Sequence, residues 1–88
     1  MKFWEIVFTK DAQKDSKLIQ RAGLRSKVEN LLNIIKINPY ESPPSYEKLS
    51  GELKGLYSRR INIQHRLIYE VYKDEMIVKV LSMWSHYE

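Results

Sequence analysis

The chain has 88 residues, a length that corresponds to one domain with a single modest hydrophobic core. Hydrophobic residues make up 43% of it and charged residues 30%, so it has enough apolar material for a core and is not expected to be disordered. Lysine and arginine give a net charge of +4, a mild excess that is compatible with nucleic acid binding but does not establish it.

Several classes of protein are excluded by what the sequence lacks. It has no cysteine, so it has neither a disulfide framework nor a thiolate metal site. Its two histidines are not spaced as metal ligands, and we expect no metal and no cofactor. No stretch approaches the roughly 20 apolar residues that span a bilayer, and no signal peptide is recognisable. We therefore expect a cytoplasmic protein without membrane contact, folded as one domain over residues 1–88.

Residues 2–22 are predicted to contain one strand and one exposed helix. Residues 2–8 are β-branched and aromatic with an alternating pattern, which is typical of a short strand. Thr9 is the predicted N-cap of a helix over residues 10–22, because its hydroxyl can accept a hydrogen bond from an early helical amide. Gly23 is the predicted end of this helix.

A second, more apolar helix is predicted over residues 24–37. Its apolar residues recur with the spacing of one buried helical face: Leu24, Val28, Leu31, Leu32 and Ile35. The pattern stops at Asn38, because Pro39 disfavours helical geometry in the residue before it. We expect the two helices to form a hairpin that lies on a sheet.

The second half is predicted to contain a long loop and three strands. Residues 39–55 hold all three prolines and two of the three glycines, and we interpret them as one long loop, a type of segment that often carries function. Strands are predicted at about 56–62, 66–72 and 76–84, the last of them central because it is apolar on both faces. The predicted class is α+β, with the order β-α-α-β-β-β and antiparallel strands after the helices.

Three arginines on neighbouring predicted strands form the first candidate site. A guanidinium group binds phosphate oxygens through two parallel hydrogen bonds and stays charged. Taken singly, Arg59, Arg60 and Arg66 are each more simply surface residues; together, with Lys54 nearby, they resemble an anion site. Arg59 and Arg60 must point to opposite faces. A three-residue turn at 63–65 places Arg60 on the Arg66 face, whereas an even turn would select Arg59.

His86 is the candidate proton donor, because imidazole is the side chain whose ordinary pKa suits proton transfer near neutrality. A frayed terminal histidine is the simpler interpretation. A three-residue turn at 73–75 would put Ser82 opposite Arg66. His86 would then lie ~13 Å further along the strand, at ~3.3 Å per residue, so the tail would have to fold back toward the arginines.

A general base is required if a ribose hydroxyl is to attack phosphorus, and Glu47 in the long loop is the candidate. Its simpler interpretation is a solvated loop residue. Tyr46 and Tyr57 are weak candidates for stacking on bases, and His65 is interpreted as a turn residue that holds the hairpin between the strands predicted at 56–62 and 66–72. Three further aromatic residues are predicted to belong to the core: Trp4, Phe8 and Tyr69.

Two stretches of the chain resemble a known family. Ser58-Arg59-Arg60-Ile61, followed three residues later by His65-Arg66-Leu67-Ile68-Tyr69, and the closing His86-Tyr87 resemble the YoeB/Txe toxins of the RelE/ParE-like superfamily of bacterial toxin–antitoxin systems. The resemblance implies a RelE-like microbial RNase fold and a ribosome-dependent mRNA endoribonuclease. Such an enzyme would cut mRNA in the A site of the 30S decoding centre and inhibit translation. It also implies a YefM-like antitoxin and is compatible with a homodimer.

The resemblance assigns roles to individual residues. The catalytic glutamate corresponds to Glu47, the catalytic arginine to Arg66, the supporting arginine to Arg60, and the terminal histidine and tyrosine to His86 and Tyr87. Attack by the 2′-OH would then give 2′,3′-cyclic phosphate and 5′-OH ends without a metal.

The loop departs from the Pro-Glu-Pro-Leu pattern of the family members that we compare it with, because here it reads Ser45-Tyr46-Glu47-Lys48-Leu49. Glu41 and Glu52 therefore remain alternative bases, and Glu88 extends past the usual terminal tyrosine. Two other functions stay open: a non-catalytic ParE-like toxin acting on gyrase, and a simple RNA- or ribosome-binding module.

Overall fold

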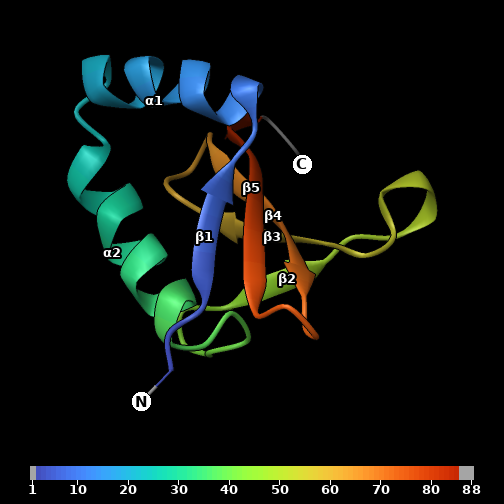
Figure 1. The fold of residues 1–88 in the computed structure, drawn as a ribbon. Coiled ribbons are helices and arrows are strands. Elements are labelled where there is room, and N and C mark those ends of the chain that lie inside the picture. The colour runs from blue at the N-terminus through green and yellow to red at the C-terminus, as the bar shows by residue number, and fades with distance from the viewer. Residues whose placement is uncertain (1, 86–88) are drawn as a thin grey trace.

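The computed structural model describes residues 2–85, in which five strands form one mixed sheet with two helices on one of its faces (Figure 1). The elements in chain order are β1 (Glu5–Phe8), α1 (Lys10–Arg21), α2 (Arg25–Ile37), β2 (Tyr46–Lys48), the short 3-10 turn η1 (Gly51–Leu53), β3 (Leu56–Arg60), β4 (Arg66–Tyr72) and β5 (Ile77–Ser85). The strand order is β1-β5-β4-β3-β2, with β1 parallel to β5 and the other pairs antiparallel. The α+β class is confirmed, and β5 is an interior strand as predicted.

The segment 39–55 is not one uninterrupted loop, so the predicted order missed a strand. β2 occupies three of its residues and pairs with β3, with Glu47 opposite Ser58. A strand of three residues at the edge of a sheet does not show an alternating pattern long enough to be read from sequence. This correction matters for function because β2 carries Glu47.

The first helix begins after its predicted cap, Thr9, and ends just before its predicted stop, Gly23, whereas Leu24 at the start of α2 makes no side-chain cap. The Thr9 hydroxyl accepts from the Ala12 amide at 3.1 Å and donates to the Leu81 carbonyl at 2.9 Å, which fixes the start of α1 against β5. Gly23 has a φ of 72°, a left-handed conformation that glycine adopts without strain, and the chain turns there into α2. In Figure 1, α1 lies across one end of the sheet and α2 runs beside β1.

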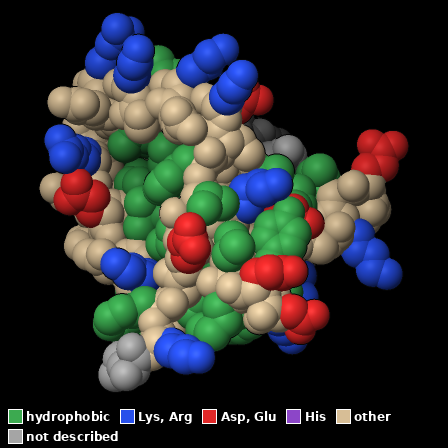
Figure 2. Space-filling model, viewed as in Figure 1, with side chains coloured by type: hydrophobic (Ala, Val, Ile, Leu, Met, Phe, Trp, Pro, Cys, Tyr) green, Lys and Arg blue, Asp and Glu red, His purple; other side chains and the backbone are tan. Residues whose placement is uncertain are grey.

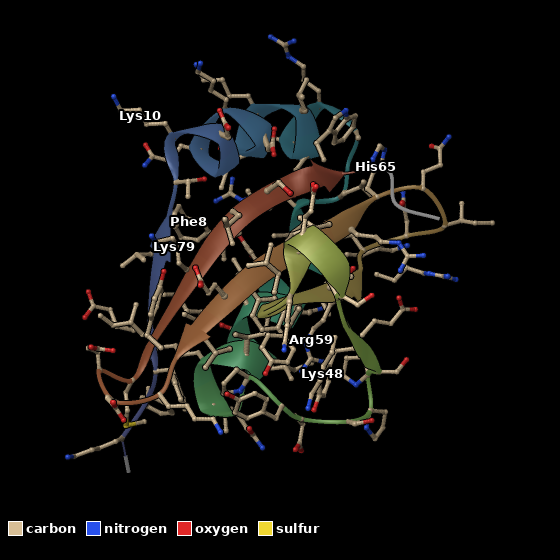
Figure 3. The ribbon with its side chains drawn as sticks, turned by 90° about the vertical axis from the view of Figure 1, so that its right-hand side faces the viewer. Phe8, Lys10, Lys48, Arg59, His65 and Lys79 are labelled. Atoms are coloured by element: carbon tan, nitrogen blue, oxygen red, sulfur yellow. The ribbon has the colours of Figure 1, made fainter. Side chains whose placement is uncertain are left out.

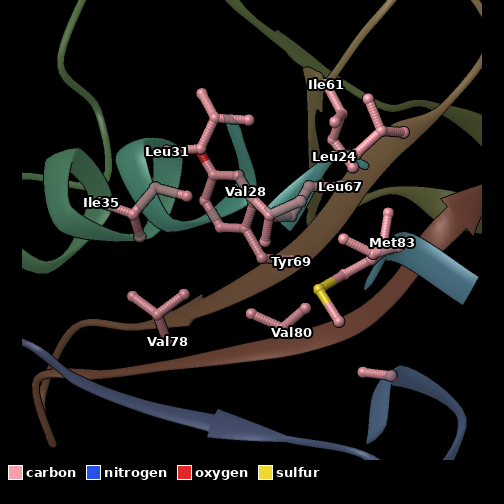
Figure 4. Close-up of a cluster of buried hydrophobic side chains, with 12 residues drawn as sticks. Leu24, Val28, Leu31, Ile35, Ile61, Leu67, Tyr69, Val78, Val80 and Met83 are labelled. Atoms are coloured by element: carbon pink, nitrogen blue, oxygen red, sulfur yellow. The ribbon is translucent and has the colours of Figure 1, made fainter. Parts of the chain in front are cut away.

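The core lies between the helices and the sheet (Figure 4). The predicted apolar face of α2 is buried against residues of β4 and β5, and each such side chain contributes roughly 1.5–3 kcal/mol. The side chains that meet there include Val28, Leu31, Ile35, Leu67, Tyr69, Val78 and Val80. Tyr69 is a core residue and Trp4 packs against the core, as predicted, but Phe8 is 37% exposed and is not part of it.

The register of β4 against β5 differs from the prediction. Ser82 lies opposite Ile68, and Arg66 lies opposite Ser85. The turn has four residues, 73–76, because Tyr72 pairs with Ile77, and two register shifts add to this difference, one between Arg66 and Ile68 and one between Ile68 and Tyr69. Bulges of this kind add residues to one strand without a clear sequence signal. As a result, the last described residue of β5 lies directly across from Arg66.

Candidate active site

The alternation of side chains along β3 separates two adjacent arginines. Arg60 pairs directly with Arg66, so these two share a face of the sheet, as the three-residue turn predicted. Arg59 pairs with Leu67, a core residue, and therefore lies on the face that the helices cover. Arg60 and Arg66 thus belong to the face opposite the helices.

On that face the two arginines line a cavity of about 260 Å³ together with Ser45, Glu47 and Ser58. The Glu47 carboxylate lies 3.8 Å from Arg66 Nη1, a distance that makes an ion pair but exceeds a hydrogen bond. The Arg66 side chain is only 13% exposed, while that of Glu47 is 67% exposed. The cavity therefore combines a sheltered guanidinium, a second guanidinium and an accessible carboxylate.

β2 brings the carboxylate to this cavity, because Glu47 lies opposite Ser58, which shares the face of Arg60. The alternative bases lie elsewhere. Glu41 accepts a hydrogen bond from the Asn38 side chain, and Glu52 is exposed on η1. Neither lines the cavity.

Arg59 is a structural residue. The sequence analysis grouped it with Arg60 and Arg66 as a candidate anion site, but it does not line the cavity. It is 1% exposed, and its guanidinium donates to the carbonyls of Pro44 at 2.7 Å, Glu41 at 2.9 Å and Pro39 at 3.1 Å. Its Nε also donates to the Tyr69 hydroxyl at 3.1 Å. Figure 3 shows Arg59 beside the loop that leads into β2. The donors that phosphate would need are thus already used to hold this loop.

Lys54 does not line the cavity either. It is exposed and follows η1, in the segment between β2 and β3. Its role as an RNA contact stays a prediction that depends on a substrate extending beyond the cavity.

Tyr46 and Tyr57 lie in a cluster of four tyrosines and are not on the arginine face. Tyr57 stacks on Tyr69 with ring centroids 5.6 Å apart, and Tyr40 contacts both Tyr46 and Tyr57. Burial, followed by the neighbouring Tyr57, raises the pKa of Tyr40 to about 12, and burial raises the pKa of Tyr69. We therefore do not retain Tyr46 and Tyr57 as base-stacking residues.

His65 holds the β3–β4 turn, as predicted. Its carbonyl accepts from the amides of Ile61 and Asn62, and its own amide donates to the Asn62 side chain at 2.7 Å. The imidazole is buried and stacks on Trp84 of β5 with centroids 3.8 Å apart. In Figure 3 it lies beside the end of β5. This contact ties the turn that precedes Arg66 to the strand that ends at Ser85.

The predicted proton donor His86 and its neighbour Tyr87 lie outside the described residues. Within residues 2–85 no group of three or more metal-ligating side chains occurs, and no helix of that part is long and apolar enough to cross a membrane.

The model of YoeB-like toxins of bacterial type II toxin–antitoxin systems matches residues 8–87. The chain belongs to this family. A YoeB toxin from Synechocystis is 33% identical over 76 residues, which cover 86% of this chain and 79% of that protein. The YoeB dimer from Staphylococcus aureus is 37% identical with a TM-score of 0.81, over 96% of this chain and 98% of that one. The YoeB/ParE toxin from Agrobacterium tumefaciens is 29% identical with a TM-score of 0.85, over 94% and 99%.

A second basic surface of this YoeB-like toxin was not considered in the sequence analysis. Four exposed basic residues recur along α1 with helical spacing: Lys10, Lys14, Lys17 and Arg21. Figure 2 shows Lys and Arg side chains gathered over α1. This ridge lies on a different element from the cavity and adds positive potential to the surface.

Sequence reasoning also missed Ser58 as a residue of the site in this YoeB-like toxin. Ser58 lies two residues before Arg60 on β3, so it shares the Arg60 face. That spacing was visible in the sequence, but a single serine within a strand carries no signal of function by itself.

Proposed function

We propose that this YoeB-like toxin is a ribosome-dependent endoribonuclease that cuts mRNA in the A site of the 30S decoding centre. The observation that supports the proposal most directly is the cavity of about 260 Å³ in which Glu47, Arg60 and Arg66 meet on one sheet face. Its size suits a single phosphodiester, since it is smaller than the roughly 300–1,000 Å³ of typical ligand pockets. It also combines a base with two anion-binding groups.

The proposed reaction is an attack by the ribose 2′-oxygen on the adjacent phosphorus. Glu47 accepts the 2′-hydroxyl proton as the new bond to phosphorus forms and the bond to the 5′-oxygen breaks. Arg66 and Arg60 stabilise charge on the non-bridging oxygens, where one preorganised contact supplies about 2.7–4 kcal/mol. His86 gives its proton to the departing 5′-oxygen, and Tyr87 orients the phosphate or the imidazole. The products are a 2′,3′-cyclic phosphate and a 5′-OH.

The different exposures of the two charged groups fit these roles. Glu47 is largely exposed, which allows its carboxylate to reach an incoming hydroxyl, whereas Arg66 is sheltered, which strengthens its attraction for a phosphate. The 3.8 Å between them is longer than a hydrogen bond, so a phosphoryl oxygen at hydrogen-bond distance would bind the guanidinium more strongly than Glu47 does. DNA lacks the 2′-hydroxyl and should not be cut.

The ribosome is proposed to position the substrate, because one small cavity cannot hold a long RNA. The basic ridge on α1 and Lys54 offer further phosphate contacts. Binding that depends on such contacts weakens as the salt concentration rises, with a slope that reflects the number of phosphates neutralised.

A reconstituted translation reaction with mapped mRNA ends tests this function. Glu47→Gln and Arg66→Ala should each lower the cleavage rate by roughly 10²–10⁴-fold, the range for a general base or a preorganised charge contact. Glu52→Gln is the matched control and should cut at the wild-type rate, because Glu52 is exposed on η1 and does not line the cavity.

The outcomes separate the alternatives. Cleavage by Glu47→Gln at the wild-type rate, or recovery of 5′-phosphate ends, would contradict the mechanism. Ribosome binding without cleavage by the wild-type protein would indicate a simple binding module, and inhibition of gyrase supercoiling would indicate a ParE-like toxin.

We also propose a YefM-like antitoxin as the protein partner and a homodimer as a further assembly. Solved structures that this chain resembles include a YoeB–YefM complex from Staphylococcus aureus, 37% identical with a TM-score of 0.80, and the YoeB dimer from the same organism. An apolar surface for such contacts exists near β1, where Phe3 is 52% exposed and Phe8 37%.

A further inference from the structure

Ser58 presents a buried hydroxyl to the cavity. The residue is 2% exposed and lies in β3 with Glu47 opposite on β2 and Ile68 opposite on β4. Within the described part of the chain its Oγ has no hydrogen-bond partner, although it lines the cavity. A buried hydroxyl left without a partner destabilises a fold, and alanine would remove that cost at the same position.

The charged groups near Ser58 determine which kind of atom would form a hydrogen bond with its hydroxyl. Arg60 lies two residues along the same strand face, and Arg66 is its cross-strand partner. An atom that reaches the Ser58 hydroxyl therefore lies near two guanidinium groups, and a negatively charged oxygen is favoured there. Toward such an oxygen the hydroxyl acts as a donor.

Glu47 does not fill this role in the structure. Its carboxylate is 3.8 Å from Arg66 Nη1, the side chain is 67% exposed, and it makes no hydrogen bond to the Ser58 hydroxyl. Ser58 and Glu47 face each other across the antiparallel pair, with Cβ atoms roughly 4.5–5.5 Å apart, so a shift of the exposed Glu47 side chain would open the hydroxyl to a bound group.

We propose that Ser58 is a positioning residue whose hydroxyl donates a hydrogen bond to a phosphoryl oxygen held by Arg60 and Arg66. The inference rests on the proposed function, because it places the scissile phosphate in this cavity. It adds a neutral donor at the floor of the site, which would fix the depth and orientation of the phosphate before Glu47 acts. The bond costs no new desolvation of the serine, since that hydroxyl is already buried.

Binding of phosphate to the isolated protein tests this without the ribosome. Inorganic phosphate and adenosine 3′-monophosphate are titrated at low salt, and the backbone amide resonances of β3 and β4 are followed by NMR. Ser58→Ala should weaken both probes by between about tenfold and a hundredfold, the range supplied by one hydrogen bond to a charged acceptor. Ser50→Ala removes the same group from an exposed position that does not line the cavity and should change affinity less than twofold.

Thermal unfolding of the same variants gives an independent readout. Ser58→Ala should unfold at the wild-type temperature or above it, because it removes an unsatisfied buried hydroxyl. A serine with a purely structural role would give the opposite pattern: a lower unfolding temperature and unchanged phosphate affinity. That pattern, or equal losses in Ser58→Ala and Ser50→Ala, would overturn the inference.

Arg66→Ala separates this inference from the proposed function. If Arg66→Ala loses phosphate while Ser58→Ala keeps it, the anion site stands and the role of Ser58 fails. If phosphate binding depends on Ser58 but the wild-type protein leaves mRNA intact on ribosomes, the hydroxyl donor stands and the nuclease function fails.

Discussion

Replacing Arg59 with methionine distinguishes a structural cation from an RNA contact. The substitution keeps a long unbranched side chain but removes the four hydrogen bonds that the guanidinium donates. The Pro39 carbonyl retains the Tyr69 hydroxyl as a donor at 2.8 Å, while the carbonyls of Pro44 and Glu41 lose the Arg59 donor.

The expected loss of folding stability comes from the carbonyls of Pro44 and Glu41, which lose their hydrogen bonds to Arg59. A hydrogen bond to a charged group contributes about 1.5–3 kcal/mol, so two of them give roughly 3–6 kcal/mol. Relief of the desolvation of a buried cation offsets part of this sum. We expect Arg59→Met to lower the free energy of unfolding by about 2–4 kcal/mol.

Urea denaturation followed by tryptophan fluorescence measures this change. With a slope of about 1 kcal/mol per M for a small domain, the midpoint should fall by roughly 2–4 M. Arg60→Met is the matched control. Arg60 is the next residue along β3, is exposed and faces the other side of the sheet, so its replacement should change stability by no more than about 0.5 kcal/mol.

The same variants also report on the site. The loop that Arg59 holds leads into β2, so Arg59→Met should displace Glu47 and lower mRNA cleavage along with stability. If Arg59→Met unfolds at the wild-type urea concentration and yet fails to cut mRNA, Arg59 contacts the substrate and our structural assignment is wrong.

Two further predictions concern the stability of the fold. Thr9→Ala should lower the free energy of unfolding by about 1–2 kcal/mol, because it removes the cap of α1 and the hydrogen bond to Leu81. Thr9→Ser keeps the hydroxyl and should retain most of the wild-type stability. Equal midpoints of chemical denaturation for Thr9→Ala and Thr9→Ser would refute this role of the hydroxyl. The pKa of Tyr40 is raised to about 12 by burial and by Tyr57, whereas an unfolded tyrosine titrates near 10. The unfolded chain therefore loses this proton first, so stability should fall as pH rises from about 10 to 12, and Tyr40→Phe should flatten that dependence in pH-resolved melting curves.

The elements with long repeating patterns could be predicted from the sequence. The apolar residues of α2 recur over about three turns, and the Thr9 cap and Gly23 mark the helix ends through chemistry that acts within a few residues. That Arg60 shares the face of Arg66 was one of the two outcomes that strand alternation allowed, and an odd number of residues in the turn selects it. Each of these signals is local.

The features that sequence reasoning missed depend on contacts between distant segments. β2 has only three residues and exists because β3 offers it an edge. The two register shifts between β4 and β5, which bring Ser85 opposite Arg66, arise from packing and leave no local signal. The burial of Arg59 could be foreseen only in part, since alternation separated it from Arg60 but did not reveal the carbonyls that surround it. The spacing of Ser58 from Arg60 placed it on the Arg60 face, but nothing in the sequence marked it as a residue of the site.

Arg59 and Arg60 are adjacent in β3 but lie on opposite faces of the sheet, and this arrangement limits how the length of the strand can change in evolution. Deleting one residue from β3 would turn the Arg59 guanidinium toward the opposite face and force Arg60 in among apolar side chains, because strand parity would invert. Lineages can therefore vary the side chains near this strand much more readily than its length, and a frame-preserving deletion there should inactivate the toxin even where every motif residue survives.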